Sequence, residues 1–327
     1  MSDKLKDRKK LFEKFSNQLH LLKDSGLINI ELKFDKTYIC PICLNQFDES
    51  DIISNQSKNF LTEEDAPPDK LNGKRIALTC KDCNSSAGHE IDNHLINRIR
   101  EIDDNNYYKG STQYRTFDFN GENITAEITS NGDGTLRVLH MNKKNNPTLL
   151  EKFIYGIKTK NIGPILNLNP KDYRILPDRV NLALLKTSYI IAFAKFGYIF
   201  LLDDFYRNIR NQISDMKYGY KGELFFSNQF KPENVGTYYI LNKGAKSILN
   251  VFSLKTEYSE TVIGSIIPLP DLTAEKIHNI LTETGHNINQ PGKVGVNVNV
   301  STYDLNADLF TNLEEIKKIV EWKKNVV

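Results

Sequence analysis

The sequence predicts a mixed α+β protein in which a small cysteine-centred module precedes a larger α+β domain. All four cysteines fall in two C-x2-C pairs within the first 83 residues. Beyond residue 105, strand-like and helix-like segments alternate without a repeat of fixed period. The 327 residues exceed the usual length of one domain, about 100 to 200 residues. We therefore expect an N-terminal helix and strand over 1–37, the cysteine module over 38–105 and the α+β domain over 106–327.

The N-terminal segment has the pattern of an amphipathic helix. Apolar residues recur at largely helical spacing from Lys4 to Leu22, and Asp24-Ser25-Gly26 is a suitable end. The stretch from Leu27 to Phe34 then roughly alternates apolar and polar residues, which predicts a short strand leading to the first cysteine pair.

The cysteine pairs are Cys40-Pro-Ile-Cys43 and Cys80-Lys-Asp-Cys83. Two such pairs can place four thiolates around one ion with the tetrahedral geometry of zinc, at Zn–S distances of roughly 2.3 Å. Two disulfides or a redox-active pair are the alternatives. The N-terminal sequence MSDKLKDRKKLFEKF is charged and lacks the apolar region of a secretory leader, so we expect a cytoplasmic protein with a structural Zn²⁺.

The segment between and after the pairs predicts two strands and a helix. The strands are expected at 60–62 and 75–79, after a polar loop over 48–59, and Asn72-Gly73 favours a turn between them. The second pair opens a helix with one apolar face, formed by Ile91, Leu95, Ile99 and Ile102. A polar break is expected at 103–106. Knuckle, two strands, knuckle and helix is the order of elements in a treble-clef zinc fold.

The remainder predicts sheets and helices of ordinary length. Three strands at 114–119, 124–128 and 135–141 form a meander, because Gly-containing turns separate them. Helices follow at 148–157 and 178–213. Further strands are expected at 223–226, 238–241, 249–254, 262–267 and 294–300, and further helices at 274–281 and 313–323.

Charge and hydropathy exclude some classes of function. The net charge is only +2, so affinity for nucleic acid cannot be argued from bulk charge. The segment from Val180 to Leu202 is strongly apolar, but Lys186 and Lys195 lie inside it, and each would cost about 2.5 to 3.5 kcal/mol near a bilayer centre. We therefore expect a buried helix of a soluble domain and no membrane association.

Three sequence blocks, CPIC, LTEEDAPPDKLNGK and LTCKDCNSSAGHEIDNHL, resemble the zinc-containing HNH endonucleases, also called ββα-metal nucleases. The resemblance covers residues 38–95. In that family the first strand ends in a (D/E)-H-x-x-P motif, which corresponds here to Glu64, Asp65 and Pro68. Asn84 corresponds to the metal ligand on the helix, and His89 is a second candidate. The sequence departs from the family in having Asp65 in place of the general-base histidine and Arg75 in the second strand, where the family has an asparagine.

The same residues suit phosphodiester hydrolysis on chemical grounds. Glu64, Asp65 and Asn84 offer oxygen ligands for a catalytic Mg²⁺ or Mn²⁺. His89 or His94 could act as the base or position phosphate, and Asp65 stands at the position of the family's general base. Each also has a simpler interpretation: the carboxylates as a solvated acidic loop, Asn84 as a helix cap, and His89 as a surface histidine. His94 lies about 140° further round an α-helix than His89, so the two cannot readily share one ion.

The sequence therefore predicts a metal-dependent endonuclease that acts on DNA, with a structural zinc, of a kind used in defence against phage or mobile DNA. The α+β remainder would supply recognition, oligomerisation or regulation, and a homo-oligomer or a partner subunit is compatible with this. The alternative prediction is a catalytically inactive zinc scaffold that binds nucleic acid or a protein partner.

Overall fold

The computed structural model confirms a mixed α+β protein with several small sheets. It describes residues 3–53, 58–119, 121–140, 142–160, 173–202, 206–215, 225–227, 230–269, 272, 276–277, 279–280, 300–301 and 308–324. The chain divides into a larger compact unit, residues 1–96, 176–255 and 260–327, and a smaller one, residues 97–175 and 256–259. These limits differ from the boundaries expected after residues 37 and 105. In particular, the larger unit joins the cysteine module to segments from the C-terminal half of the chain.

The N-terminal helix α1 is confirmed and spans Asp3–Asp24. Its apolar face is fully buried through Phe12, Phe15, Leu19 and Leu22. The strand expected at 27–34 is wrong, because the structure gives this segment no sheet partner among the described residues. The side chain of Gln46 takes up its backbone groups instead, accepting from Lys33 N at 2.9 Å and donating to Glu31 O at 2.9 Å.

The cysteine module contains two antiparallel strand pairs and a long helix. The helix runs from Lys81 to Asn106 and includes a π-helical turn at Gly88–Asp92, so the polar break expected at 103–106 is wrong. The first hairpin strand extends through the acidic residues, which were expected to lie in a loop. The elements are β1 (Tyr38–Ile39), β2 (Gln46–Phe47), β3 (Leu61–Ala66), β4 (Lys74–Cys80), α2 (Lys81–Ala87) and α3 (Asn93–Asn106).

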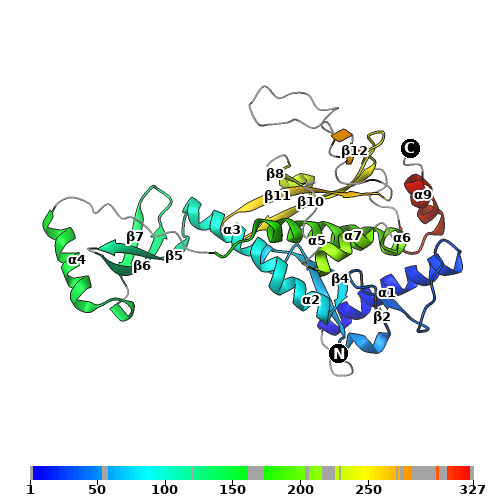
Figure 1. The fold of residues 1–327 in the computed structure, drawn as a ribbon, viewed down its shortest axis with the longest axis horizontal. Helices are drawn as coiled ribbons and strands as arrows, with labels where there is room; N and C mark the ends of the chain where they lie inside the picture. The colour runs from blue at the N-terminus through cyan, green and yellow to red at the C-terminus, as the bar shows by residue number, and fades with distance from the viewer. Residues whose placement is uncertain are drawn as a thin grey trace. The chain divides into compact units, whose positions relative to one another are not determined.

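Helix α5 (Pro177–Phe196) is the centre of the larger unit. It contacts β3 and β4 of the cysteine module and also lies along the C-terminal sheet, as Figure 1 shows. Gly197, with φ of +60°, ends α5, so the single helix expected over 178–213 is divided into α5, α6 (Tyr198–Leu201) and α7 (Arg207–Ser214). The apolar character of α5 therefore reflects burial on two sides. Among the described residues, no helix has both the length and the apolar character needed to cross a bilayer.

The C-terminal sheet has five strands in the order β12-β9-β10-β11-β8, and all described pairings are antiparallel. The strands expected at 238–241, 249–254 and 262–267 are confirmed. Their bounds are β9 (Gly236–Ile240), β10 (Ser247–Lys255), β11 (Glu260–Pro268), β8 (Phe225–Ser227) and β12 (Val300–Ser301). Most of the predicted strand 294–300 and parts of the predicted helix 274–281 and strand 223–226 lie outside the described residues.

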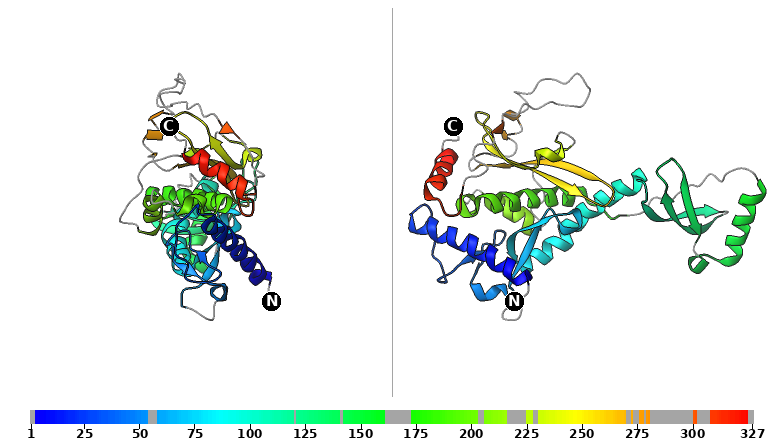
Figure 2. Two further views of the ribbon diagram at one scale, coloured as in Figure 1. Left: turned by 90° about the vertical axis from the view of Figure 1, so that its right-hand side faces the viewer. Right: turned by 180° about the vertical axis from the view of Figure 1, so that it is seen from behind.

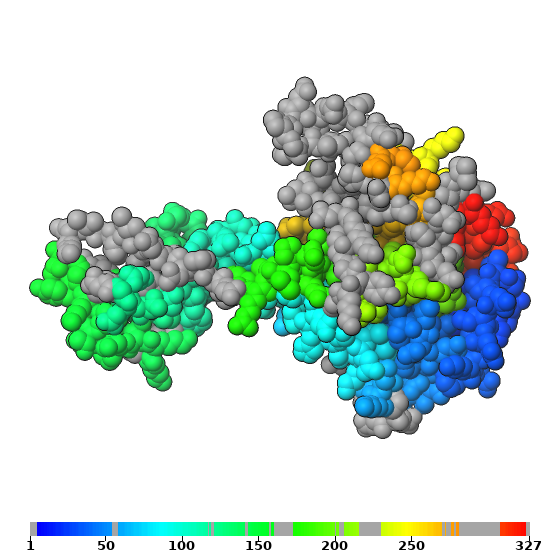
Figure 3. All heavy atoms as spheres, viewed as in Figure 1, coloured from blue at the N-terminus to red at the C-terminus, as the bar shows by residue number. Residues whose placement is uncertain are grey.

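The C-terminal helix α9 (Leu313–Lys324) is confirmed and belongs to the same unit as α1. Figures 2 and 3 show the two helices as neighbours, in red and blue. The ring of Phe310, just before α9, meets Phe15 of α1 edge to face at 5.3 Å between centroids. The two ends of the described chain thus pack on one core.

The smaller unit confirms the predicted three-stranded meander. Strands β5 (Thr112–Phe119), β6 (Glu122–Ser130) and β7 (Leu136–His140) pair in sequence order, and helix α4 (Pro147–Lys160) follows. Ile124 and Ala126 of β6 are buried with Leu149, Leu150 and Phe153 of α4. Helix α4 therefore covers one face of the sheet. This agrees with the burial along β6, where buried and more exposed residues alternate because successive side chains point to opposite faces.

Candidate metal centre and acidic site

The two C-x2-C pairs come together in space. The Sγ atoms of Cys40, Cys43, Cys80 and Cys83 all lie within 4.8 Å of one another, and all four thiols are free. In this structure neither cysteine pair forms a disulfide. Cys43 Sγ and Cys80 Sγ are 3.7 Å apart, close to the separation of about 3.8 Å expected for two sulfurs tetrahedrally bound to zinc. The four cysteines can therefore hold a metal such as zinc.

The chemistry of the donors also fits a cation. Burial raises the pKa of the Cys40 thiol well above its ordinary value, so its thiolate needs a positive charge nearby. The backbone N–H of Cys80 donates to Cys40 Sγ at 3.5 Å, a further contact that favours a thiolate. Zinc bound by four cysteines has no open position for substrate, so such a site would be structural.

Tyrosine hydroxyls from α5 and α6 hold the first cysteine knuckle in place. Tyr189 donates to the Pro41 carbonyl at 2.8 Å, and Tyr198 both accepts from Ile39 N at 2.8 Å and donates to Ile39 O at 2.9 Å. All these groups are buried. The metal centre therefore depends on segments that follow it by about 150 residues in the sequence.

Glu64 is not part of a solvated loop but is buried in β3, with 2% of its side chain exposed. Its Oε1 lies 2.7 Å from Nζ of Lys186 in α5, and its Oε2 accepts from Thr79 Oγ1 at 2.7 Å. Lys186 Nζ also lies 2.7 Å from Oδ2 of Asp92 in the π-helical turn. Both oxygens of Glu64 are thus already engaged by groups of the protein.

Asp65, the next residue, has a different environment. A β-bulge falls between Glu64 and Asp65, and Asp65 pairs across the hairpin with the exposed Arg75. Partial burial raises the pKa of Asp65 to about 6, and the negative charge of Asp69 contributes to the rise, while Arg75 opposes it. A carboxylate with this pKa is largely ionised at neutral pH and is a stronger base than an ordinary aspartate.

Asn84 ties the first turn of α2 to β3. Its Nδ2 donates to the Glu63 carbonyl at 2.9 Å and to Thr62 Oγ1 at 3.0 Å. The side chain of Glu63 is paired with Arg8 of α1 at 2.7 Å; burial acts to raise the pKa of Glu63, but the Arg8 guanidinium outweighs it and lowers that pKa. Asn84 therefore fixes the position of the strand that carries the acidic residues.

The two histidines of the helix do not join these groups in a described metal cluster. His89 lies in the π-helical turn and is exposed, as the interpretation of a surface histidine expects. His94 Nδ1 accepts from Leu176 N at 3.2 Å, just before α5 begins. This contact gives His94 a structural role at the start of α5.

The predicted set of ligands for a hard cation, Glu64, Asp65 and Asn84, does not fit as a set. Lys186 already forms an ion pair with Glu64, and Thr79 donates a hydrogen bond to it. Asn84 donates its N–H groups to β3. Asp65 is the one member whose carboxylate remains among acidic neighbours. Among the described residues, the four cysteines are the one group of three or more His, Cys, Asp or Glu side chains placed to hold a metal.

Sequence reasoning missed Lys186 and Asp92 as partners of the acidic strand. The available signal was Lys186 itself, because a lysine inside an apolar helix requires a buried carboxylate.

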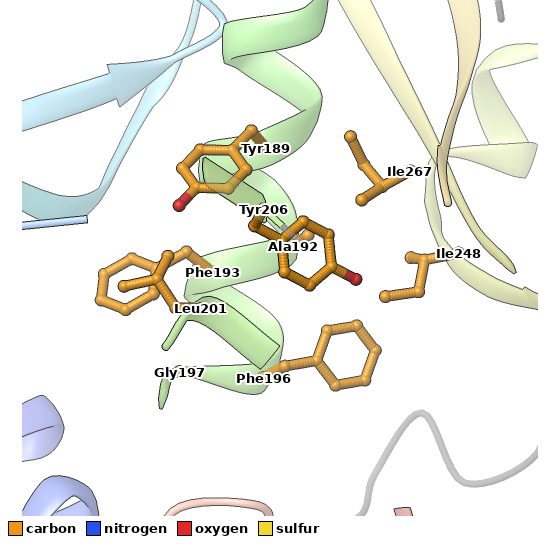
Figure 4. Close-up of a pocket in the computed structure, with 9 residues that line it drawn as sticks. All are labelled: Tyr189, Ala192, Phe193, Phe196, Gly197, Leu201, Tyr206, Ile248 and Ile267. Atoms are coloured by element: carbon orange, nitrogen blue, oxygen red, sulfur yellow. The ribbon is translucent and has the colours of Figure 1, made fainter. Parts of the chain in front are cut away.

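An apolar pocket lies between α5 and strands β10 and β11 (Figure 4). It has a volume of about 20 Å³, room for roughly one water molecule, and Phe196, Ile248 and Ile267 are among its lining residues. It is therefore too small for an organic ligand.

In comparisons with known proteins, no protein-family model, no curated protein and no solved structure matches this chain.

Proposed function

We propose that the chain is an endonuclease of the HNH type that hydrolyses phosphodiester bonds in DNA, built on a treble-clef zinc module. The observation that carries this proposal is Asp65, a half-buried carboxylate with a pKa of about 6 at the end of the β3–β4 hairpin. An aspartate with an ordinary pKa would be a weak base in the position where the HNH family has histidine. The environment of Asp65 raises its pKa and so makes it a stronger base than an ordinary aspartate.

The chemistry of the proposed reaction follows from the residues around the bulge. Asp65 would accept a proton from the water that attacks phosphorus, while the P–O bond to the leaving oxygen breaks and that oxygen takes up a proton from solvent water. Arg75, its exposed cross-strand partner, would bind a phosphate oxygen with its guanidinium. The Zn²⁺ bound by the cysteines would hold the hairpin against α2 and would take no part in the reaction.

The test uses the full-length, zinc-loaded protein on supercoiled and linear DNA, with Mg²⁺, with Mn²⁺ and with a chelator of hard cations. Asp65→Asn should abolish nicking while keeping the zinc and the fold. Glu90→Gln is the matched control, because Glu90 is an exposed carboxylate in the π-helical turn Gly88–Asp92. Full cleavage by Asp65→Asn would refute the assignment of Asp65.

The second candidate is a catalytically inactive zinc scaffold that binds nucleic acid or a protein partner. The observation that favours it is Lys186, whose ammonium already neutralises Glu64, the other carboxylate of the predicted active site. The same preparations distinguish the two functions. Binding of DNA without cleavage under every metal condition supports the scaffold, whereas cleavage that requires Asp65 supports the nuclease.

A further inference from the structure

Three charged side chains form a buried cluster where β3, the π-helical turn and α5 meet. The exposed fractions of the side chains are 2% for Glu64, 3% for Lys186 and 13% for Asp92. Lys186 Nζ lies 2.7 Å from a carboxylate oxygen of each acid. Thr79 Oγ1 completes the cluster by donating to the second oxygen of Glu64. One ammonium thus bridges two carboxylates from different elements.

The cluster needs its cation. Burial raises the pKa of Asp92 and acts to lower that of Lys186, but the facing carboxylates outweigh burial and raise the pKa of Lys186 above its ordinary value. The ammonium therefore stays charged at all physiological pH values. The other oxygen of Asp92, Oδ1, is buried and has no hydrogen-bond partner, so the cluster carries more acceptor capacity than Lys186 and Thr79 satisfy.

We propose that Lys186 is the resident cation of this site: its ammonium does for Glu64 and Asp92 what a divalent metal ion would otherwise do. The hairpin and the helix each contribute one carboxylate, and α5 contributes the charge that holds them together. The protein consequently binds no divalent cation at Glu64 while Lys186 is present. This goes beyond the proposed nuclease, since it concerns how the acidic strand is neutralised.

Replacing the ammonium by an apolar group of similar length provides the test. Lys186→Met leaves two buried carboxylates facing each other without a cation, so it should lower the thermal unfolding midpoint at pH 7.5. Added Mg²⁺, a hard cation that prefers oxygen ligands, should then bind between Glu64 and Asp92 and raise the midpoint of this variant by several degrees. In the wild-type protein, Mg²⁺ should produce no rise in the midpoint that depends on Glu64.

The matched control is Lys186→Met with Glu64→Gln, in which one carboxylate is neutral and the cluster no longer needs a divalent ion. It should be more stable than Lys186→Met alone and insensitive to Mg²⁺. If Lys186→Met does not fold in the absence of Mg²⁺, refolding with and without Mg²⁺ gives the same comparison. Zinc content is measured in every preparation, so that loss of zinc is not mistaken for loss of the buried cluster.

Two results would overturn the proposal. One is a wild-type protein that Mg²⁺ stabilises in a manner abolished by Glu64→Gln, because Glu64 would then bind metal beside Lys186. The other is a Lys186→Met variant that Mg²⁺ does not stabilise. DNA cleavage is recorded separately on the same proteins, and an inactive wild type would refute the nuclease without affecting this result.

Discussion

Two consecutive acidic residues, Glu64 and Asp65, lie in different environments, and a β-bulge falls between them. Glu64 is buried against an ammonium, whereas Asp65 is partly buried with a negatively charged neighbour, Asp69. Desolvation and like charge both favour the protonated form of Asp65, so the folded state binds this proton more tightly than the unfolded state does. The stability that this proton contributes is fully present below pH 3.8 and is lost as the pH rises through about 6.

Asp65→Asn should therefore stabilise the protein at pH 7 and have a smaller effect at pH 4. Asparagine keeps the shape of the side chain but removes the charge that is unfavourable in the folded state. Urea unfolding of wild type and variant at both pH values measures the difference. An equal effect at the two pH values would show that the substitution acts through packing rather than through the charge. A gain in stability together with a loss of cleavage would identify Asp65 as a functional residue.

The same pKa sets the pH dependence of the proposed reaction. If ionised Asp65 is the base, the cleavage rate under single-turnover conditions should rise through pH of about 6 and level off above it. Glu90→Gln should leave the profile unchanged. A rate that rises with a midpoint near pH 4 instead would indicate a carboxylate with an ordinary pKa and would argue against Asp65.

At the scale of elements, local sequence patterns predicted features that depend on neighbouring residues. They missed features that depend on contacts with residues far away in the sequence. The spacing of the cysteines was sufficient to predict that Cys40, Cys43, Cys80 and Cys83 lie together, because two C-x2-C pairs are typical of one four-thiolate site. The extension of β3 through its acidic residues was missed, because the group that neutralises the buried carboxylate of Glu64 is Lys186, which lies 122 residues later in the sequence. The strand predicted at 27–34 is also missing, because the side chain of Gln46 bonds the backbone of Glu31 and Lys33 there. Such a contact leaves no periodic pattern in the sequence.

The contact between α2 and β3 depends on Asn84. Asn84→Ala removes the donor to the Glu63 carbonyl and to Thr62 Oγ1, so it should cost about 1 to 3 kcal/mol in the free energy of unfolding. Urea unfolding measures this, with the exposed neighbour Ser85→Ala as the control. An unchanged stability together with lost DNA cleavage would assign Asn84 to the reaction rather than to the fold.

The two cysteine pairs, as a candidate zinc site, give a separate prediction. Cys80 is buried, ends β4 and precedes α2, so Cys80→Ser removes a ligand at the junction of strand and helix. The variant should no longer be able to bind zinc and should lose the folded structure of the knuckles, since binding of a structural metal contributes folding free energy. Metal analysis and circular dichroism measure both effects. A well-folded variant without zinc would show that α5 and its tyrosines stabilise the knuckles without the metal.

At the scale of the whole molecule, one buried glutamine of α1 joins segments from both ends of the chain. Gln18 donates to the carbonyls of Phe196 and Leu309 and accepts from the N–H of Tyr198. These contacts place the amide against the residue that ends α5, Gly197. A β-carbon at Gly197 would lie 1.9 Å from Gln18 Oε1, and the φ of +60° is itself unfavourable for any residue with a side chain. The packing of α1 is therefore coupled to the end of α5 and to the C-terminal segment through one side chain.

Gly197→Ala tests this coupling through a double-mutant cycle with Gln18→Ala. In the wild-type background the substitution should cost the backbone strain, about 1 to 3 kcal/mol, together with the cost of displacing Gln18 from its three backbone partners. In the Gln18→Ala background the clash is absent, so only the strain should remain. Gly88→Ala is the control, because Gly88 has ordinary helical backbone angles and open space around it, and alanine should be neutral or stabilising there. Additive costs for the two substitutions would show that Gln18 and Gly197 are not energetically coupled and would contradict this prediction.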